Sequence, residues 1–295
     1  MKRRAVAVVV LVVLLFGLTA FAASHAEPNG VIAFVTDFGR KDFYVGAMEG
    51  VVLSKFPEAK IVHISHEVEE YNIREGAITT YLAAKEYPKG TVFCTVVDPG
   101  VGTERKPIVL ETETGHYFIG PDNGVLTMVM NNMGVKEVRV LENPDWRREG
   151  WVSKTFHGRD VFSPGAAHLA SGEPFTEAGP EYMEYKTLDI QQSRIEDGAV
   201  VGEAVMIDEY GNIQANVHAS ELEEIGLEVG DTVEVQIGEV VEQAEYATTY
   251  GDVPEGDFLV FRASTDFIEV AINMGSAQEN FGAELGSTIE FRPAD

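Results

Sequence analysis

The chain has 295 residues, a formal net charge of −26 and a single cysteine. A surface this negative repels phosphate backbones and anionic lipid head groups, which argues against nucleic acid as a partner. A single cysteine allows no intrachain disulfide, and a chain of this length can bury a core large enough to need none.

The first 26 residues have the layout of an export signal. Three basic residues at positions 2–4 precede an apolar run, and two small-residue motifs follow it, Ala20-Phe21-Ala22 and Ser24-His25-Ala26. A basic start, an apolar stretch and an A-x-A-like end are typical of a cleaved signal peptide. We expect an exported protein, periplasmic or secreted. The alternative is an uncleaved membrane anchor, because the run is close to the length that spans a bilayer.

Residues 29–192 are expected to form an α/β domain, because short apolar runs alternate with segments whose apolar residues are three and four apart. The expected strands are 31–36, 61–65, 91–97, 108–113 and 116–119, and the expected helices are 42–56, 73–86, 124–133 and 160–170. Continuous apolar strands between helices predict a mostly parallel central sheet covered by helices. The dipeptide Thr114-Gly115 predicts a hairpin turn between the last two strands.

Residues 197–295 are expected to form a smaller all-β domain. The expected strands are 200–207, 213–217, 232–237, 258–262, 267–272 and 288–291, with one helical segment at 219–225. Turns rich in Gly, Asp and Asn separate these strands, which predicts a barrel or a sandwich.

Two acidic turns stand where strands of the first domain end. Asp37 follows the first strand and Asp98 follows the third. Ligands of open α/β sheets bind at the carboxyl ends of strands, so these carboxylates could hold a ribose diol or a water. Pro99 and two glycines could return Arg105 towards Asp98, as a functional pair or as a structural ion pair. Taken alone, Asp and Gly are also ordinary turn formers.

Three other segments carry polar side chains that could bind or react. His157 precedes Gly158 at a helix entrance and titrates near neutrality, although it could equally bond to backbone. The turn 208–212 could be a plain hairpin, or its asparagine could pair with a base edge. His63 and His66 are three apart on an expected strand and should face opposite sides, so we expect no metal site.

Together these segments resemble one family, the S-adenosyl-L-methionine (SAM) hydroxide adenosyltransferases, or SAM hydrolases, which are related to the SAM-dependent fluorinase and chlorinase. The matching stretches, in chain order, are Thr36-Asp37-Phe38-Gly39, residues 97–105 (VDPGVGTER), Gly120-Pro121-Asp122-Asn123-Gly124, residues 155–160 (TFHGRD), Tyr210-Gly211-Asn212 and residues 268–277 (IEVAINMGSA). Each motif alone is weak, whereas six in the same order are specific, and they extend over residues 30–295.

The resemblance implies that Asp98, Arg105 and His157 direct a water onto C5′ of SAM, which yields adenosine and methionine. SAM is then the substrate, and no cofactor or metal is expected. The residues implied in substrate binding are Asp37 for the ribose, Asp42, Asp208 and Ser264 for the methionine amine and carboxylate, Asn212 and the backbone around Met274 for the adenine, and Tyr250 as an aromatic stack. The family also implies an α/β domain followed by a β domain, and a homotrimer with SAM at the subunit interfaces.

The halogenating relatives differ from this chain at the implied triad. They lack the Arg–His combination and carry a small hydroxyl residue just after the position of His157, where this chain has Gly158. Water is therefore the expected nucleophile. Two alternatives stay open from the sequence: a SAM-dependent halogenase, and an exported SAM- or adenosine-binding protein without turnover.

Overall fold

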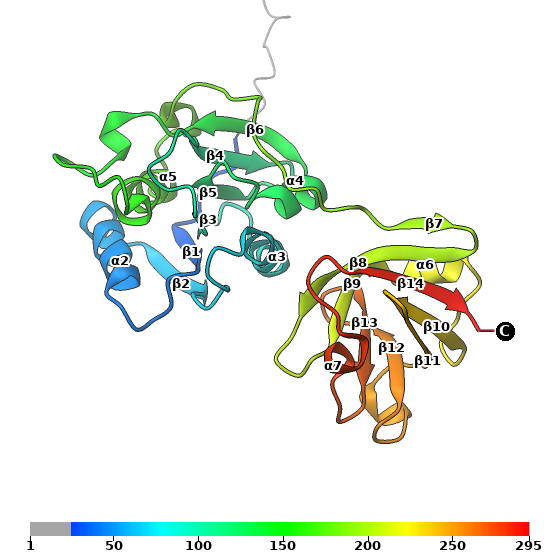
Figure 1. Cartoon of the computed structure of the whole chain (residues 1–295). Coiled ribbons are helices and arrows are strands. Elements are labelled where there is room, and N and C mark those ends of the chain that lie inside the picture. Colours follow the sequence, from blue (N-terminus) through cyan, green and yellow to red (C-terminus); the bar gives the residue numbers. More distant parts are fainter. Residues whose placement is uncertain (1–24, 295) are drawn as a thin grey trace, which may run out of the picture.

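The computed structural model describes residues 25–294, which form two domains joined by an extended linker (Figure 1). The expected signal peptide, residues 1–26, lies almost entirely outside these described residues. Between residues 25 and 294, no helix is long and apolar enough to cross a membrane.

The N-terminal domain contains a six-stranded sheet in the order β2-β1-β3-β5-β4-β6. Its strands are β1 (Val31–Thr36), β2 (Lys60–Ser65), β3 (Val92–Val96), β4 (Pro107–Thr112), β5 (Tyr117–Pro121) and β6 (Val135–Val140). Strands β2, β1, β3 and β5 are parallel, whereas β4 runs antiparallel to both β5 and β6. The expected mostly parallel sheet is therefore not confirmed, because the sheet is mixed.

A hairpin makes the sheet mixed, and a sixth strand was missed. The predicted hairpin at Thr114-Gly115 does form, and a hairpin reverses chain direction between β4 and β5. Strand β6 was not predicted, because its sequence VKEVRV alternates charged and apolar residues and only two of its residues are buried. That pattern suits an edge strand, where one face stays in water.

Four helices cover the two faces of this sheet. Helices α2 (Tyr44–Lys55) and α5 (Ser163–Ala170) pack together on one face, and α3 (Ile73–Ala84) and α4 (Thr127–Met133) pack on the other. Along β1, Ile32 and Phe34 join the first core while Ala33 and Val35 join the second. This alternation explains why the strand reads as one continuous apolar run.

The C-terminal domain is a closed barrel of seven strands. Its strands are β8 (Ala199–Ile207), β9 (Ile213–His218), β10 (Thr232–Ile237), β11 (Val240–Tyr246), β12 (Phe258–Arg262), β13 (Phe267–Ile272) and β14 (Thr288–Pro293), with β7 (Arg194–Glu196) added beside β8. Pairing of β14 with β8 closes the ring, so the domain is a barrel and not a sandwich. Sequence reasoning missed β11, where charged and polar residues alternate with less exposed ones. Two short helices, α6 (Ala219–Glu224) and α7 (Ala277–Phe281), lie between strands.

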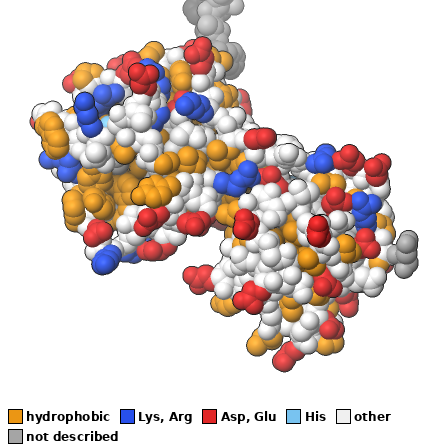
Figure 2. Space-filling view, viewed as in Figure 1, with side chains coloured by type: hydrophobic (Ala, Val, Ile, Leu, Met, Phe, Trp, Pro, Cys, Tyr) orange, Lys and Arg blue, Asp and Glu red, His pale blue; other side chains and the backbone are white. Residues whose placement is uncertain are grey.

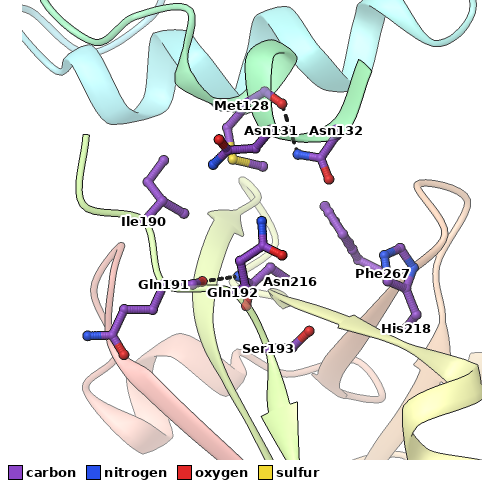
Figure 3. Close-up of a pocket in the computed structure, with 10 residues that line it drawn as sticks. All are labelled: Met128, Asn131, Asn132, Ile190, Gln191, Gln192, Ser193, Asn216, His218 and Phe267. Carbon is purple, nitrogen blue, oxygen red and sulfur yellow. Dashed lines mark hydrogen bonds between the residues drawn. The ribbon is translucent and has the colours of Figure 1, made fainter. Parts of the chain in front are cut away.

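The domains meet along α3. Arg74 forms a 2.5 Å ion pair with Glu203 of β8, and Phe267 of β13 packs into the core beneath α3 and α4. A cavity of about 110 Å³ lies at this junction, between α4, the linker and β9 (Figure 3). There the Asn216 amide donates to the carbonyl of Gln191. None of the predicted site residues lines this cavity.

Candidate active site

The structure brings Asp98, Arg105 and His157 together. Asp98 follows β3, Arg105 precedes β4, and His157 immediately precedes a π-helical turn, Gly158–Phe162. Arg105 Nε donates to Asp98 Oδ1 at 3.0 Å, and Arg105 Nη2 donates both to Asp98 Oδ2 and to His157 Nδ1, the latter at 2.8 Å. The Asp98 and Arg105 side chains are only 5% and 4% exposed. Buried, two-pronged pairing of this kind fixes the geometry of both groups.

A glycine allows the two loops of this cluster to meet. Gly102 has a φ of +79°, and a Cβ at this position would lie 2.5 Å from the carbonyl oxygen of Lys154. A side chain here would therefore push the loop that carries Arg105 away from the segment that carries His157. The glycine was quoted in the sequence motif, and the structure supplies the physical reason for it.

The hydrogen bonds determine where His157 holds its proton. A guanidinium can only donate, so His157 Nδ1 accepts from Arg105, and the neutral ring carries its hydrogen on Nε2. Burial lowers the pKa of His157, and the nearby positive charge of Arg105 lowers it further, against a smaller opposing effect of Asp98. His157 is therefore a neutral imidazole at pH 7.

One donor of the cluster is left over. Arg105 Nη1 is buried and donates to no acceptor within the described chain. An unsatisfied buried donor is costly, on the order of 1–3 kcal/mol, and such costs are usually tolerated where a ligand supplies the partner. The cluster thus offers a charged donor to a small oxygen species.

Asp37 lies beside this cluster, in the turn that follows β1. Its carboxylate accepts the backbone N–H of Tyr71 at 3.0 Å. Burial raises the pKa of Asp37, and the charge of Asp98 raises it further, against the lowering effect of that hydrogen bond. Tyr71 was not predicted, yet it is 68% exposed and has a φ of +69°. A non-glycine residue in this strained region is common at functional sites, but no sequence pattern announces it.

An exposed aromatic surface adjoins the same turn. It consists of Phe38, Phe43, Tyr44, Trp151 and Phe156, which line a depression of about 390 Å³. It lies beside α2, where hydrophobic side chains gather on the visible face of the domain (Figure 2). Phe43 is 65% exposed and Trp151 is 75% exposed, which is unusual for such large apolar side chains.

Asp42, in the loop before α2, is exposed and makes no hydrogen bond or ion pair within residues 25–294. In the sequence it directly precedes Phe43 and Tyr44 of the aromatic surface. Its predicted role in binding methionine stays a prediction.

In the C-terminal domain, four predicted residues line one pocket of about 690 Å³: Asp208, Asn212, Tyr250 and Met274. The Asn212 amide donates to Asp208 Oδ2 at 2.9 Å and to the Tyr250 hydroxyl at 3.0 Å. Both amide hydrogens are thereby used, so Asn212 offers only its carbonyl oxygen to a ligand. Met274 is 84% exposed, with a φ of +60°.

Glu269 stands behind this pocket and was not predicted as a site residue. It is 5% exposed, and it accepts hydrogen bonds from the Tyr250 hydroxyl at 2.8 Å and from Gln214 at 2.8 Å. A charged residue in the middle of an apolar strand is the signal that could have found it.

Ser264 is not brought to this pocket. It is exposed in the turn between β12 and β13, at the opposite end of β13 from Met274. The described residues that line the pocket with Asn212 all belong to the C-terminal domain.

The expectation that His63 and His66 face opposite sides is wrong. Strand β2 ends at Ser65, so His66 leaves the strand and turns back. His63 Nδ1 and His66 Nε2 are 2.7 Å apart and share a hydrogen bond. The periodicity argument failed because it extended the strand one residue too far.

Both domains match domains of known proteins. The model of the SAM hydroxide adenosyltransferase N-terminal domain matches residues 32–179, and that of the C-terminal domain matches residues 202–290. A protein of Salinispora tropica named (R)-S-adenosyl-L-methionine hydrolase is 36% identical, over 89% of this chain and 97% of its own. A protein of the same name from Methanocaldococcus jannaschii is 31% identical over 88% and 95%.

More distant relatives and a solved structure agree with this placement. A fluorinase of Nocardia brasiliensis is 26% identical, over 89% of this chain and 96% of its own. The crystal structure of an uncharacterized conserved protein from Thermotoga maritima superimposes with a TM-score of 0.86. It is 39% identical and covers 88% of this chain and 99% of that one.

Proposed function

This chain belongs to the SAM hydroxide adenosyltransferase family, and on that premise we propose that it hydrolyses SAM to adenosine and L-methionine. The observation that carries the proposal is the buried Asp98–Arg105–His157 cluster with its unused Arg105 Nη1 donor. Relatives at 31–36% identity are named for this activity.

The proposed reaction needs little chemical assistance at sulfur. A sulfonium is already a good leaving group, so neither a general acid nor a metal nor a cofactor is required there. The barrier lies in holding an oxygen nucleophile in line with C5′, opposite the sulfur. Positioning of this kind can contribute about 7–11 kcal/mol in ideal cases.

The three residues divide this work. Asp98 and Arg105 orient the water, and Arg105 Nη1 donates to its oxygen while the positive charge favours hydroxide character. The oxygen forms a bond to C5′, the C5′–S bond breaks, and its electron pair stays on the sulfur of methionine. The proton lost by the water passes to His157 or through it to solvent; it enters at Nδ1, the one ring nitrogen without a hydrogen, when the bond that Nδ1 accepts from Arg105 Nη2 is exchanged for one from the water.

Gly158 supports water over halide as the nucleophile. A Cβ at Gly158 would lie 3.2 Å from Met48 Sδ and 3.2 Å from Phe38 Cε2, closer than ordinary packing allows. The small hydroxyl residue expected here in the halogenating relatives therefore does not fit without movement of Met48 or Phe38.

The first test follows the oxygen of the water. With SAM in ¹⁸O-labelled water, we expect adenosine labelled at its 5′ oxygen, measured by mass spectrometry. Asp98→Ala, Arg105→Ala and His157→Ala should each lower kcat by about 10²-fold or more, because each removes a positioning or proton-transfer group. Unlabelled adenosine, a 5′-chloro product in chloride, or wild-type rates in all three variants would contradict the proposal.

The pH dependence of turnover tests the role of His157. A base must be neutral to act, and burial lowers the pKa of His157 below 6.5, so the neutral form persists to lower pH than in a free histidine. We expect kcat to stay level from pH 8 down to about 6.5 and to fall only below that value. A His157→Gln variant should lack this acid limb. Loss of half the activity above pH 6.5 in the wild type would argue against His157 as the base.

We further propose a homotrimer in which each SAM molecule lies between the N-terminal half-site of one subunit and the C-terminal half-site of the next. Two observations support it. The pocket that holds Asp208, Asn212 and Tyr250 is lined by residues of the C-terminal domain alone, and the aromatic surface beside Asp37 is exposed. Large exposed apolar patches commonly mark protein interfaces.

Mixing of two inactive variants tests this arrangement. Asp98→Ala disables the N-terminal half-site and Asn212→Ala the C-terminal one. In a shared site, co-expression in equal amounts should restore about one quarter of the wild-type sites, because each site draws its halves at random from two subunits. Adenosine release at SAM concentrations below KM measures this. No recovery in mixed assemblies would place each site within one chain.

We also propose that the protein is exported and that cleavage follows Ala22 rather than Ala26. In the described chain, the Ala26 backbone N–H donates to Glu111 at 2.8 Å, and His25 Nδ1 bonds to the same carboxylate at 2.5 Å. The Glu111 side chain is fully buried, so cleavage after Ala26 would remove two of its partners.

The intact mass of the protein from a native export host tests the cleavage site. A chain that begins at Ala23 agrees with the proposal, whereas one that begins at Glu27 would show that the His25 and Ala26 contacts are dispensable. A full-length, membrane-bound chain would indicate the uncleaved anchor.

A further inference from the structure

A chain of four polar side chains leads from the surface of α2 to the turn that carries Asp37. Glu49 lies 3.3 Å from His63 Nε2, His63 Nδ1 lies 2.7 Å from His66 Nε2, and His66 Nδ1 lies 2.8 Å from Thr36 Oγ1. Thr36 and His66 are buried, His63 is partly buried, and Glu49 is at the surface. None of these four residues has a role in the proposed reaction.

The direction of these hydrogen bonds follows from the carboxylate at one end. Glu49 forms an ion pair with His63 at Nε2, 3.3 Å away, which favours a hydrogen on that nitrogen, and a neutral His63 then accepts at Nδ1. His66 therefore donates from Nε2 to His63 and accepts at Nδ1 from the Thr36 hydroxyl. The Glu49–His63 pair thus selects the tautomer of His66, as the second partner of a histidine generally does.

The inner end of the chain holds the turn on both sides of Asp37. The backbone N–H of Phe38 donates to Thr36 Oγ1 at 3.2 Å, and the backbone N–H of Gly39 donates to the carbonyl of His66 at 2.7 Å. Gly39 has a φ of +61°, a left-handed conformation that glycine adopts without strain and that lets the turn close here. His66 therefore fixes the turn through its ring, by way of Thr36, and through its own backbone.

We propose that His66 is a positioning residue for Asp37: it holds the turn so that the Asp37 carboxylate faces the ribose hydroxyls, and Glu49 and His63 hold His66. The inference rests on the proposed function, because that function assigns the ribose to Asp37. Its consequence is that substrate affinity depends on a histidine that never touches the substrate.

The surroundings of His66 keep this arrangement in place near neutral pH. Burial, together with the neighbouring His63 ring and the charge of Arg40 in the loop after β1, lowers the pKa of His66 to about 4. His66 therefore stays neutral at pH 7 and can accept from Thr36. Glu49 from α2 is the acidic group beside this pair, and it forms its ion pair with His63.

The test compares four variants by steady-state kinetics with SAM. His66→Phe keeps the size of the ring but removes both of its hydrogen bonds, and Thr36→Val removes the hydroxyl that links it to the turn. Both should raise KM by about tenfold while kcat changes less than about threefold, because ribose contacts act equally in ground and transition states. His66→Asn, whose Oδ1 can replace Nδ1 as acceptor, should recover most of the affinity.

His116→Phe is the matched control. His116 is also a buried histidine with two hydrogen bonds, to Thr114 and to the carbonyl of Tyr87, but it lies in the β4–β5 hairpin. It should leave both KM and kcat near wild type. If His66→Phe and Thr36→Val keep the wild-type KM, or if His66→Asn is no better than His66→Phe, the positioning role is wrong.

Adenosine binding separates this inference from the proposed function. Calorimetric titration with adenosine reports the ribose contact without turnover, and it should show the same order of affinities: wild type and His116→Phe, then His66→Asn, then His66→Phe and Thr36→Val. If the adenosine affinities follow this order but the wild type releases no methionine from SAM, only the hydrolase function is contradicted. Equal adenosine affinity in all variants would contradict only the role of His66.

Discussion

The buried ion pair between Asp98 and Arg105 is the contact on which the candidate site depends. It closes the loop between β3 and β4, and through Arg105 Nη2 it also holds His157, which belongs to a segment some fifty residues further along. Removing either charge would leave the other buried without a partner, which typically costs about 3–5 kcal/mol. The sequence leaves open whether this pair is functional or a structural ion pair. The structure allows both, because the same contact stabilises the loop and positions the site.

The sequence predicts those strands and turns that depend on the local pattern of apolar and turn-forming residues. Alternating apolar segments give β1 its observed bounds, and the Thr114-Gly115 turn gives the β4–β5 hairpin. It fails where tertiary packing decides: β6 and β11 carry charged residues suited to a half-exposed strand, so neither stands out as an apolar run. The mixed sheet follows from the β4–β5 hairpin, which reverses β4 relative to the other strands, so the predicted turn and the expected mostly parallel sheet were at odds.

The candidate site divides in the same way. Asp98, Arg105 and His157 could be named from ordered motifs, and the structure brings their side chains together. Tyr71 could not, because its interest lies in a strained backbone angle. Glu269 and His66 stand out in the sequence, as a charge within an apolar strand and as one of two nearby histidines, but their contacts depend on tertiary structure. Ser264 shows the converse: a motif position suggests a ligand contact, but the fold of one chain places it away from the pocket with Asn212.

The crowded position of Gly158 has an evolutionary consequence. Because Met48 and Phe38 crowd the space that a side chain would need, a hydroxyl residue is accepted here only if one of these neighbours shifts by a few tenths of an ångström. In a lineage moving between water and halide as nucleophile in this scaffold, a change at this glycine is easier after one of these neighbours has become smaller or has rotated. The order of substitutions is thus constrained by packing rather than by chemistry, and identical changes at this glycine will have different effects in backgrounds that differ only at those two side chains.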